Sequence, residues 1–149
     1  MATRSVIAKL DSKTKKIKAV YCHNDGYLAH VGTVLDSHYQ DESKVDELLK
    51  NGDISILGNN IGEKIDFDDF ELAHKNKQCL FYARDRGENI KSKKPIILED
   101  DIALLEFTDT ACHAQYVYMY ALGAWYVYCM AEDNQFAELD DVLQKVYNS

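Results

Sequence analysis

Residues 84–88, Arg-Asp-Arg-Gly-Glu, place two guanidinium groups and two carboxylates within five residues, at the end of a predicted strand. They follow the apolar stretch Cys79–Ala83, which is typical of a strand buried on both faces. If that strand continues, Arg84 and Arg86 project to one side and form a forked donor site for a phosphate or carboxylate. The alternative is that both arginines pair internally with Asp85 and Glu88.

A nucleotide held by these arginines could stack its base on Tyr27 or Tyr82, and this defines a small-ligand hypothesis. A weaker enzymatic hypothesis uses His23 and Asp25 as an acid/base pair near Cys22. No nucleophile–base motif supports it, so no catalytic residue is predicted. The ligand-binding candidates are therefore His23, Asp25, Tyr27, Tyr82, Arg84, Asp85, Arg86 and Glu88.

Two Cys-His dipeptides, Cys22-His23 and Cys112-His113, raise the possibility of a zinc site. Adjacent side chains on a strand face opposite ways, so each dipeptide offers one ligand at most to a shared ion. Structural zinc sites usually draw on closely spaced pairs, and the four cysteines form no C-x-x-C motif. We therefore expect buried thiols, with no metal and no cofactor.

The segment 116–130 predicts a β-hairpin that holds five of the ten tyrosines. A three-residue loop at 121–123, ending in Gly123, would pair Tyr120 with Ala124. One face would then carry all five tyrosines, while a two-residue loop, for which Leu-Gly is poorly suited, would divide them. The tyrosine face is either a protein-binding surface or is covered by helices. The protein-binding candidates are Tyr116, Tyr118, Tyr120, Tyr126 and Tyr128.

The remaining patterns predict a single α+β domain over residues 1–149, with about five strands and about four helices. Strands are expected at 5–10, 16–23 and 79–83, with a short one at 96–98 and two in the hairpin. Helices are expected at 27–38, 42–50, about 100–112 and from Asn134 to about Val146. Because the strands come in adjacent hairpins, the sheet is predicted to be mainly antiparallel.

The chain has 149 residues and a net charge of −8. Direct nucleic-acid binding is not favoured, because phosphate neutralisation requires the opposite sign. An acidic surface could instead meet a basic partner; mimicry of nucleic acid would require the carboxylates of 66–71 and 132–141 to line one surface. No apolar run approaches the ~20 residues of a membrane span, and no signal segment follows Met1, so we expect an intracellular protein without a membrane partner.

Several motifs occur together: Met1-Ala-Thr-Arg-Ser5, Tyr21-Cys-His-Asn-Asp-Gly-Tyr27, Gly52-Asp-Ile-Ser55, Asn60-Ile-Gly-Glu-Lys64, Phe81-Tyr-Ala-Arg-Asp-Arg-Gly-Glu88, Tyr116-Val-Tyr118 and Trp125-Tyr-Val127. In this order they resemble a family of small phage and prophage proteins. Asn24 and Ala83 depart from that pattern, which usually has an aromatic residue and a glycine there. The resemblance implies no activity and no catalytic residue.

It does imply an accessory protein in the cytoplasm of a bacterial host cell. The first functional hypothesis is therefore a non-enzymatic protein that binds and inhibits a host factor, such as a CRISPR-type defence component, through an acidic and aromatic surface. The alternative is a small-ligand or nucleotide-sequestering protein that uses the 84–88 loop. Homo-oligomerisation stays open.

Overall fold

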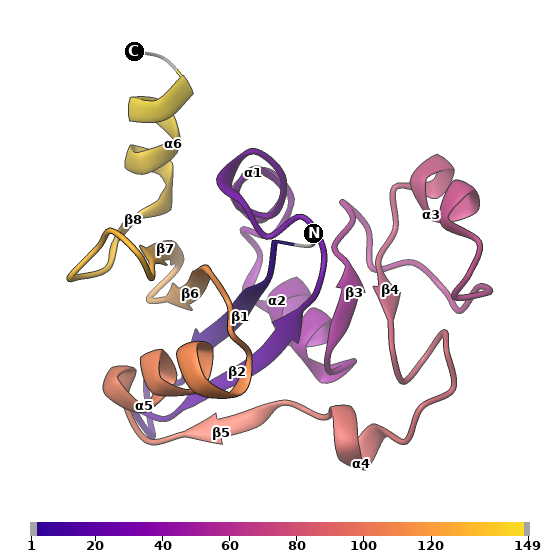
Figure 1. The fold of residues 1–149 in the computed structure, drawn as a ribbon, viewed down its shortest axis with the longest axis horizontal. Coiled ribbons are helices and arrows are strands. Elements are labelled where there is room, and N and C mark those ends of the chain that lie inside the picture. Colours follow the sequence, from indigo (N-terminus) through magenta and orange to yellow (C-terminus); the bar gives the residue numbers. More distant parts are fainter. Residues whose placement is uncertain (1–2, 148–149) are drawn as a thin grey trace.

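A computed structural model describes residues 3–147, which form a mixed eight-stranded sheet with helices on both faces (Figure 1). The strands are β1 (Ser5–Leu10), β2 (Ile17–Cys22), β3 (Ile54–Ile56), β4 (Leu80–Phe81), β5 (Ile96–Leu98), β6 (Tyr116–Ala121), β7 (Ala124–Cys129) and β8 (Ala137–Glu138). The α-helices are α1 (Thr33–His38), α2 (Glu42–Lys50), α3 (Phe70–Asn76), α4 (Ile90–Lys93), α5 (Asp101–Glu106) and α6 (Leu139–Tyr147). Two π-helical segments are η1 (Leu28–Gly32) and η2 (Phe107–Ala111).

The strand order is β4-β3-β2-β1-β6-β7-β8, and β5 pairs with β2 beside this path. The β1–β6 and β2–β3 pairs are parallel, and the other pairs are antiparallel. The α+β class is thus confirmed, while about five strands and four helices understate the architecture. The strands that the sequence missed, β3 and β8, are three and two residues long, too short to show an alternating pattern.

Side chains that alternate along the central strands enter two hydrophobic cores, one on each face of the sheet. Ile7, Val20 and Cys22 lie in the core beneath α1, α2 and α6. Val6, Ala8 and Ala19 lie in the other core, with Leu104 of α5. The predicted helix α2 begins as expected, since the Asp41 side chain accepts a hydrogen bond from the Ser43 N–H at 3.0 Å.

The predicted register of the tyrosine hairpin is wrong. The loop has two residues, Leu122 and Gly123, with φ angles of 51° and 83°, as in a type I′ turn. Tyr120 therefore pairs with Trp125 and Tyr118 with Val127. This shift by one residue places Tyr116, Tyr118 and Tyr120 on the face beneath the helices, and Tyr126 and Tyr128 on the opposite face.

The helices also differ from the expectation. Helix α6 begins at Leu139 and not after Asn134, because Ala137 and Glu138 first pair with β7. The expected helix over 100–112 is α5 followed by the π-helical η2. Helices α3 and α4 were not predicted. No helix within residues 3–147 is long and apolar enough to cross a membrane.

Candidate functional site

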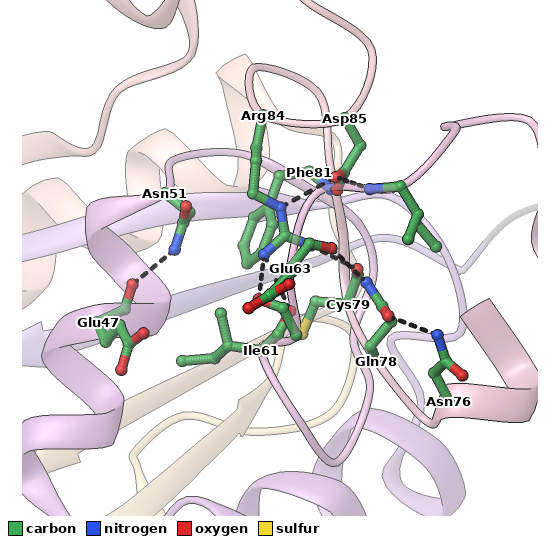
Figure 2. A network of polar contacts seen from close by, with 12 residues as sticks. Glu47, Asn51, Ile61, Glu63, Asn76, Gln78, Cys79, Phe81, Arg84 and Asp85 are labelled. Atoms are coloured by element: carbon green, nitrogen blue, oxygen red, sulfur yellow. Dashed lines mark hydrogen bonds and ion pairs between the residues drawn. The ribbon is translucent and has the colours of Figure 1, made fainter. Parts of the chain in front are cut away.

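Arg84 is held inside the protein and does not form the predicted fork (Figure 2). Its Nε donates to Asp85 Oδ1 at 3.0 Å. Its terminal nitrogens donate to the carbonyl oxygens of Ile61 at 3.1 Å, Gly62 at 2.7 Å and Cys79 at 3.2 Å. The guanidinium also lies 4.8 Å from the centroid of the Phe81 ring. Through these contacts, Arg84 joins the loop at residues 61–62 to Cys79 and Phe81, at strand β4.

Asp85 completes this network from a buried position. Its carboxylate accepts hydrogen bonds from the backbone N–H groups of Phe81 at 2.8 Å and Ile65 at 3.1 Å, in addition to Arg84. Because Figure 2 shows both side chains turned toward the loop backbone, the pair stabilises the fold and presents no open donor fork. Internal pairing, the second of the two sequence interpretations, is the one observed for Arg84.

The Arg86 side chain is exposed to solvent. Its Nε lies 3.6 Å from Glu88 Oε2, and its guanidinium lies 5.4 Å from the centroid of the Phe67 ring. Phe67 also covers Tyr82, with ring centroids 5.4 Å apart. Tyr27 is exposed on the loop before η1. The backbone turns after β4, so the alternation that would have aligned the two arginines ends at Phe81.

His23 and Asp25 do not form an acid/base pair in the part of the chain that the structure describes. His23 Nδ1 instead shares a hydrogen bond with the Tyr21 hydroxyl at 2.6 Å. Asp25 has a φ of 57°, and its carbonyl oxygen accepts from the Val31 N–H at 3.2 Å. Burial raises the pKa of the Cys22 thiol to about 12, so it is a poor nucleophile at neutral pH.

A cavity of about 550 Å³ lies where β1 begins and β2 ends, a size that suits a small ligand. We call it the basic pocket, because Arg4, Lys91 and Lys94 line it together with a single carboxylate, Asp53. Tyr21 and the η2 residue Phe107 supply aromatic rings. The full lining is Arg4, Tyr21, Asp53, Lys91, Ser92, Lys94, Ile96, Phe107, Ala111, Cys112 and His113.

Close backbone packing brings α4 and its lysines to the pocket. Gly52 has a φ of 79°, and a Cβ at this position would lie 2.2 Å from the Lys93 carbonyl oxygen, so only glycine fits. The next residue, Asp53, donates its N–H to that same oxygen at 2.8 Å. Asp53 Oδ1 accepts the Tyr21 N–H at 3.0 Å, which fixes the carboxylate against β2. The loop thus joins α4 to the sheet.

Arg4 is positioned through its backbone, which leaves its side chain free. Its N–H donates to Gln115 Oε1 at 3.2 Å, and its carbonyl oxygen accepts the Gln115 N–H at 3.0 Å. Within residues 3–147, the side chains of Arg4, Lys91 and Lys94 make no salt bridge and no hydrogen bond to the protein. Three cations around one cavity are therefore available to an anion.

Burial also affects the acidic groups of the pocket. It raises the pKa of Asp53, against the opposing effects of the Tyr21 N–H and Lys93. It raises the pKa of Tyr21 to about 12 and that of the Cys112 thiol to about 12, with Asp53 adding to the effect on Cys112. The hydroxyl and the thiol therefore stay neutral at pH 7, and the net charge of the pocket is positive.

Sequence reasoning missed this pocket because five separate segments build it. Its one local signal is the run of lysines at 91, 93 and 94. Arg4 belongs to the Met1-Ala-Thr-Arg-Ser5 motif, which implies no chemistry, and Phe107 lies in none of the motifs. Only the fold brings the N-terminus, the 52–53 loop and η2 together.

An acidic cleft of about 390 Å³ lies between α1, β7 and the start of α6. Asp36, Glu138 and Asp140 line it, with Gln40, Ala124 and Trp125. Burial, together with the charge of Asp140, raises the pKa of Asp36. Tyr126 pairs with Glu138 across β7 and β8 and stays partly exposed. The carboxylates expected of a partner surface therefore gather here, whereas Tyr126 does not line the cleft.

The chain matches no protein-family model, no curated protein and no solved structure. No group of three or more His, Cys, Asp or Glu side chains within residues 3–147 has the geometry to hold a metal ion.

Proposed function

We propose that the protein is a non-enzymatic binding protein that takes a small anionic ligand with a planar ring, of the nucleotide class, into the basic pocket. The observation that carries this proposal is the set of three cations, Arg4, Lys91 and Lys94, that have no acceptor within the described chain. A phosphate would pair with them, and an aromatic base would pack on Tyr21 or Phe107. The nucleotide-binding hypothesis thus moves from the 84–88 loop to this pocket.

Thermal unfolding with a panel of mono-, di- and cyclic nucleotides, and with inorganic phosphate, tests the proposal. A ligand that binds only the folded state adds about 2.7 kcal/mol at a free concentration of about 100 Kd. For a domain of this size, that corresponds to a Tm increase of about 5–11 °C. The variant R4Q/K91Q should lose this increase.

The matched control is K13Q/K15Q, which removes the same charge from the exposed β1–β2 turn. It should keep the full ligand-induced shift. If no ligand of the panel raises Tm and none copurifies with the protein, the proposal is wrong. A shift that persists in R4Q/K91Q would place the ligand elsewhere.

The acidic cleft favours a second candidate function, which is inhibition of a basic host protein. Tyr118 and Tyr120 are buried, so they cannot form the contact surface, whereas Tyr126 and Tyr128 are partly exposed. Capture of host proteins from a bacterial lysate at low and high salt tests this candidate. One basic partner that is lost at high salt and in D36N/E138Q would support it. Capture that is unaffected by D36N/E138Q would exclude the cleft.

A further inference from the structure

Strand β5 leaves an apolar backbone edge without a partner. It pairs with β2 along one side, and no other strand among residues 3–147 pairs with its second side. In Figure 1 it runs along the outside of the sheet, between α4 and α5. The side chains of Ile96 and Ile97 are 43% and 55% exposed. Exposed apolar edge strands are prone to pair with another strand.

The alternation of hydrogen bonds between β2 and β5 shows which backbone groups of β5 face away from β2. The Tyr21 N–H donates to Asp53, on the side of β2 that faces away from β1. Ala19 and Ile17 alternate with Tyr21 and so direct their backbone groups to the same side, toward their partners Ile96 and Leu98. Ile97, between those two partners, therefore directs its N–H and C=O outward.

The residues before strand β5 and the residues after it carry opposite charge. Lys91, Lys93 and Lys94 precede the strand, and Glu99, Asp100 and Asp101 follow it. An antiparallel second copy would place the basic end of each β5 against the acidic end of the other. A parallel copy would place like charges together, which is unfavourable.

We propose that two copies of this chain associate about a two-fold axis by antiparallel pairing of β5 with β5. Ile97 lies opposite Ile97 of the second copy, and the two exchange both backbone hydrogen bonds. The Glu99 N–H then donates to the carbonyl oxygen of Pro95 in the second copy. Pro95 has no N–H to offer the edge, so the pairing is limited to this short central segment.

The second copy fits this edge because the edge is complementary to itself. A two-fold interface uses the same patch on both subunits, so each basic end must meet an acidic end. The sequence from 93 to 101 satisfies this condition around Ile97, with lysines on one side and carboxylates on the other. This interface does not depend on a ligand in the basic pocket.

Charge-reversal variants at the two ends of β5 test this pairing. Sedimentation velocity over a wide protein concentration range, without ligand, measures the dimerisation of each variant. In this register Lys93 lies opposite Asp101 of the second copy, so K93E alone would bring like negative charges together and D101K alone would bring like positive charges together. Each variant should associate at least about tenfold more weakly than the wild type. Asp100 is left unchanged because its side chain caps α5 by accepting the Ala103 N–H at 2.8 Å.

An equimolar mixture of K93E and D101K should recover the dimer, because opposite charges then face each other at positions 93 and 101 at both ends of the heterodimer. I97E should abolish association, while L122E, the same change at the exposed hairpin tip, should not affect it. A wild-type protein that stays monomeric at all concentrations overturns the proposal. So does a dimer that K93E, D101K and I97E leave unchanged, or a mixture of K93E and D101K that does not reassociate.

Discussion

Removal of the Asp85 carboxylate should unfold the loop network that holds Arg84. In the variant D85A, the backbone N–H groups of Phe81 and Ile65 lose their acceptor, and Arg84 loses its counter-ion. The Asp85 side chain is fully buried, and that of Arg84 is 17% exposed. Water can therefore reach the guanidinium only in part and cannot reach the Phe81 N–H without local opening.

The magnitude follows from these contacts. Removing one partner of a buried ion pair costs about 3–5 kcal/mol. Arg84 keeps its three carbonyl acceptors, so we take the lower end of that range, about 3 kcal/mol. The buried Phe81 N–H adds about 1–3 kcal/mol when it is left unsatisfied. D85A should therefore lower the free energy of unfolding by about 4–6 kcal/mol, a Tm decrease of about 8–24 °C at this chain length.

Urea denaturation followed by circular dichroism measures this loss. R86A is the control, because the Arg86 side chain is 57% exposed and makes no hydrogen bond within residues 3–147, and its loss should cost less than about 1 kcal/mol. If D85A costs less than about 1 kcal/mol as well, the network does not stabilise the fold. Arg84 would then return as a candidate ligand-binding residue.

Two further predictions concern the hairpin turn and the basic pocket. L122N should raise the free energy of unfolding by about 0.5–1 kcal/mol, because Leu122 is 82% exposed with a φ of 51°, a conformation that Asn adopts more readily; an unchanged or lower Tm would contradict the two-residue loop. Burial raises the pKa of Asp53 above its usual 3.8, so the Asp53 carboxyl binds its proton more tightly in the folded state than in the unfolded state. The contribution of Asp53 to the free energy of unfolding therefore falls as pH rises from 3.8 through the raised pKa of the folded state. D53N, which keeps an oxygen acceptor for the Tyr21 N–H, should thus gain stability relative to wild type as pH rises from about 4 to 7 in urea denaturation; a difference that does not change with pH would contradict this.

Local patterns were sufficient for the elements whose signals lie within a few residues. Helix α2 has an Asp41 cap and inward-facing Val45, Leu48 and Leu49, so its boundaries follow from sequence alone. The β1–β2 hairpin likewise shows alternation on both strands and a polar turn. The α+β class follows from these elements, whereas strands of two or three residues leave no periodic signal.

The register of the tyrosine hairpin could not be read locally, because both loop lengths preserve the alternation. Distant contacts decide it. The Trp125 Nε1–H donates to the Tyr39 carbonyl oxygen at 2.8 Å, and the Tyr118 hydroxyl donates to that of Gly26 at 2.7 Å. Both bonds require Trp125 and Tyr118 on the same face, beneath the helices. The three-residue loop would have directed Trp125 to the other face and lost this bond.

The motif residues that are most conspicuous in the sequence are least available to a ligand. Arg84 already makes four hydrogen bonds to the protein, so an anion would have to replace them, and charge-assisted bonds contribute about 1.5–3 kcal/mol each. At Arg4 an anion displaces only water, because its guanidinium has no acceptor within the described chain. The energetic cost of binding is therefore much lower at Arg4 than at Arg84. For an arginine, the absence of partners in the fold indicates a binding role more directly than the density of charge in its motif.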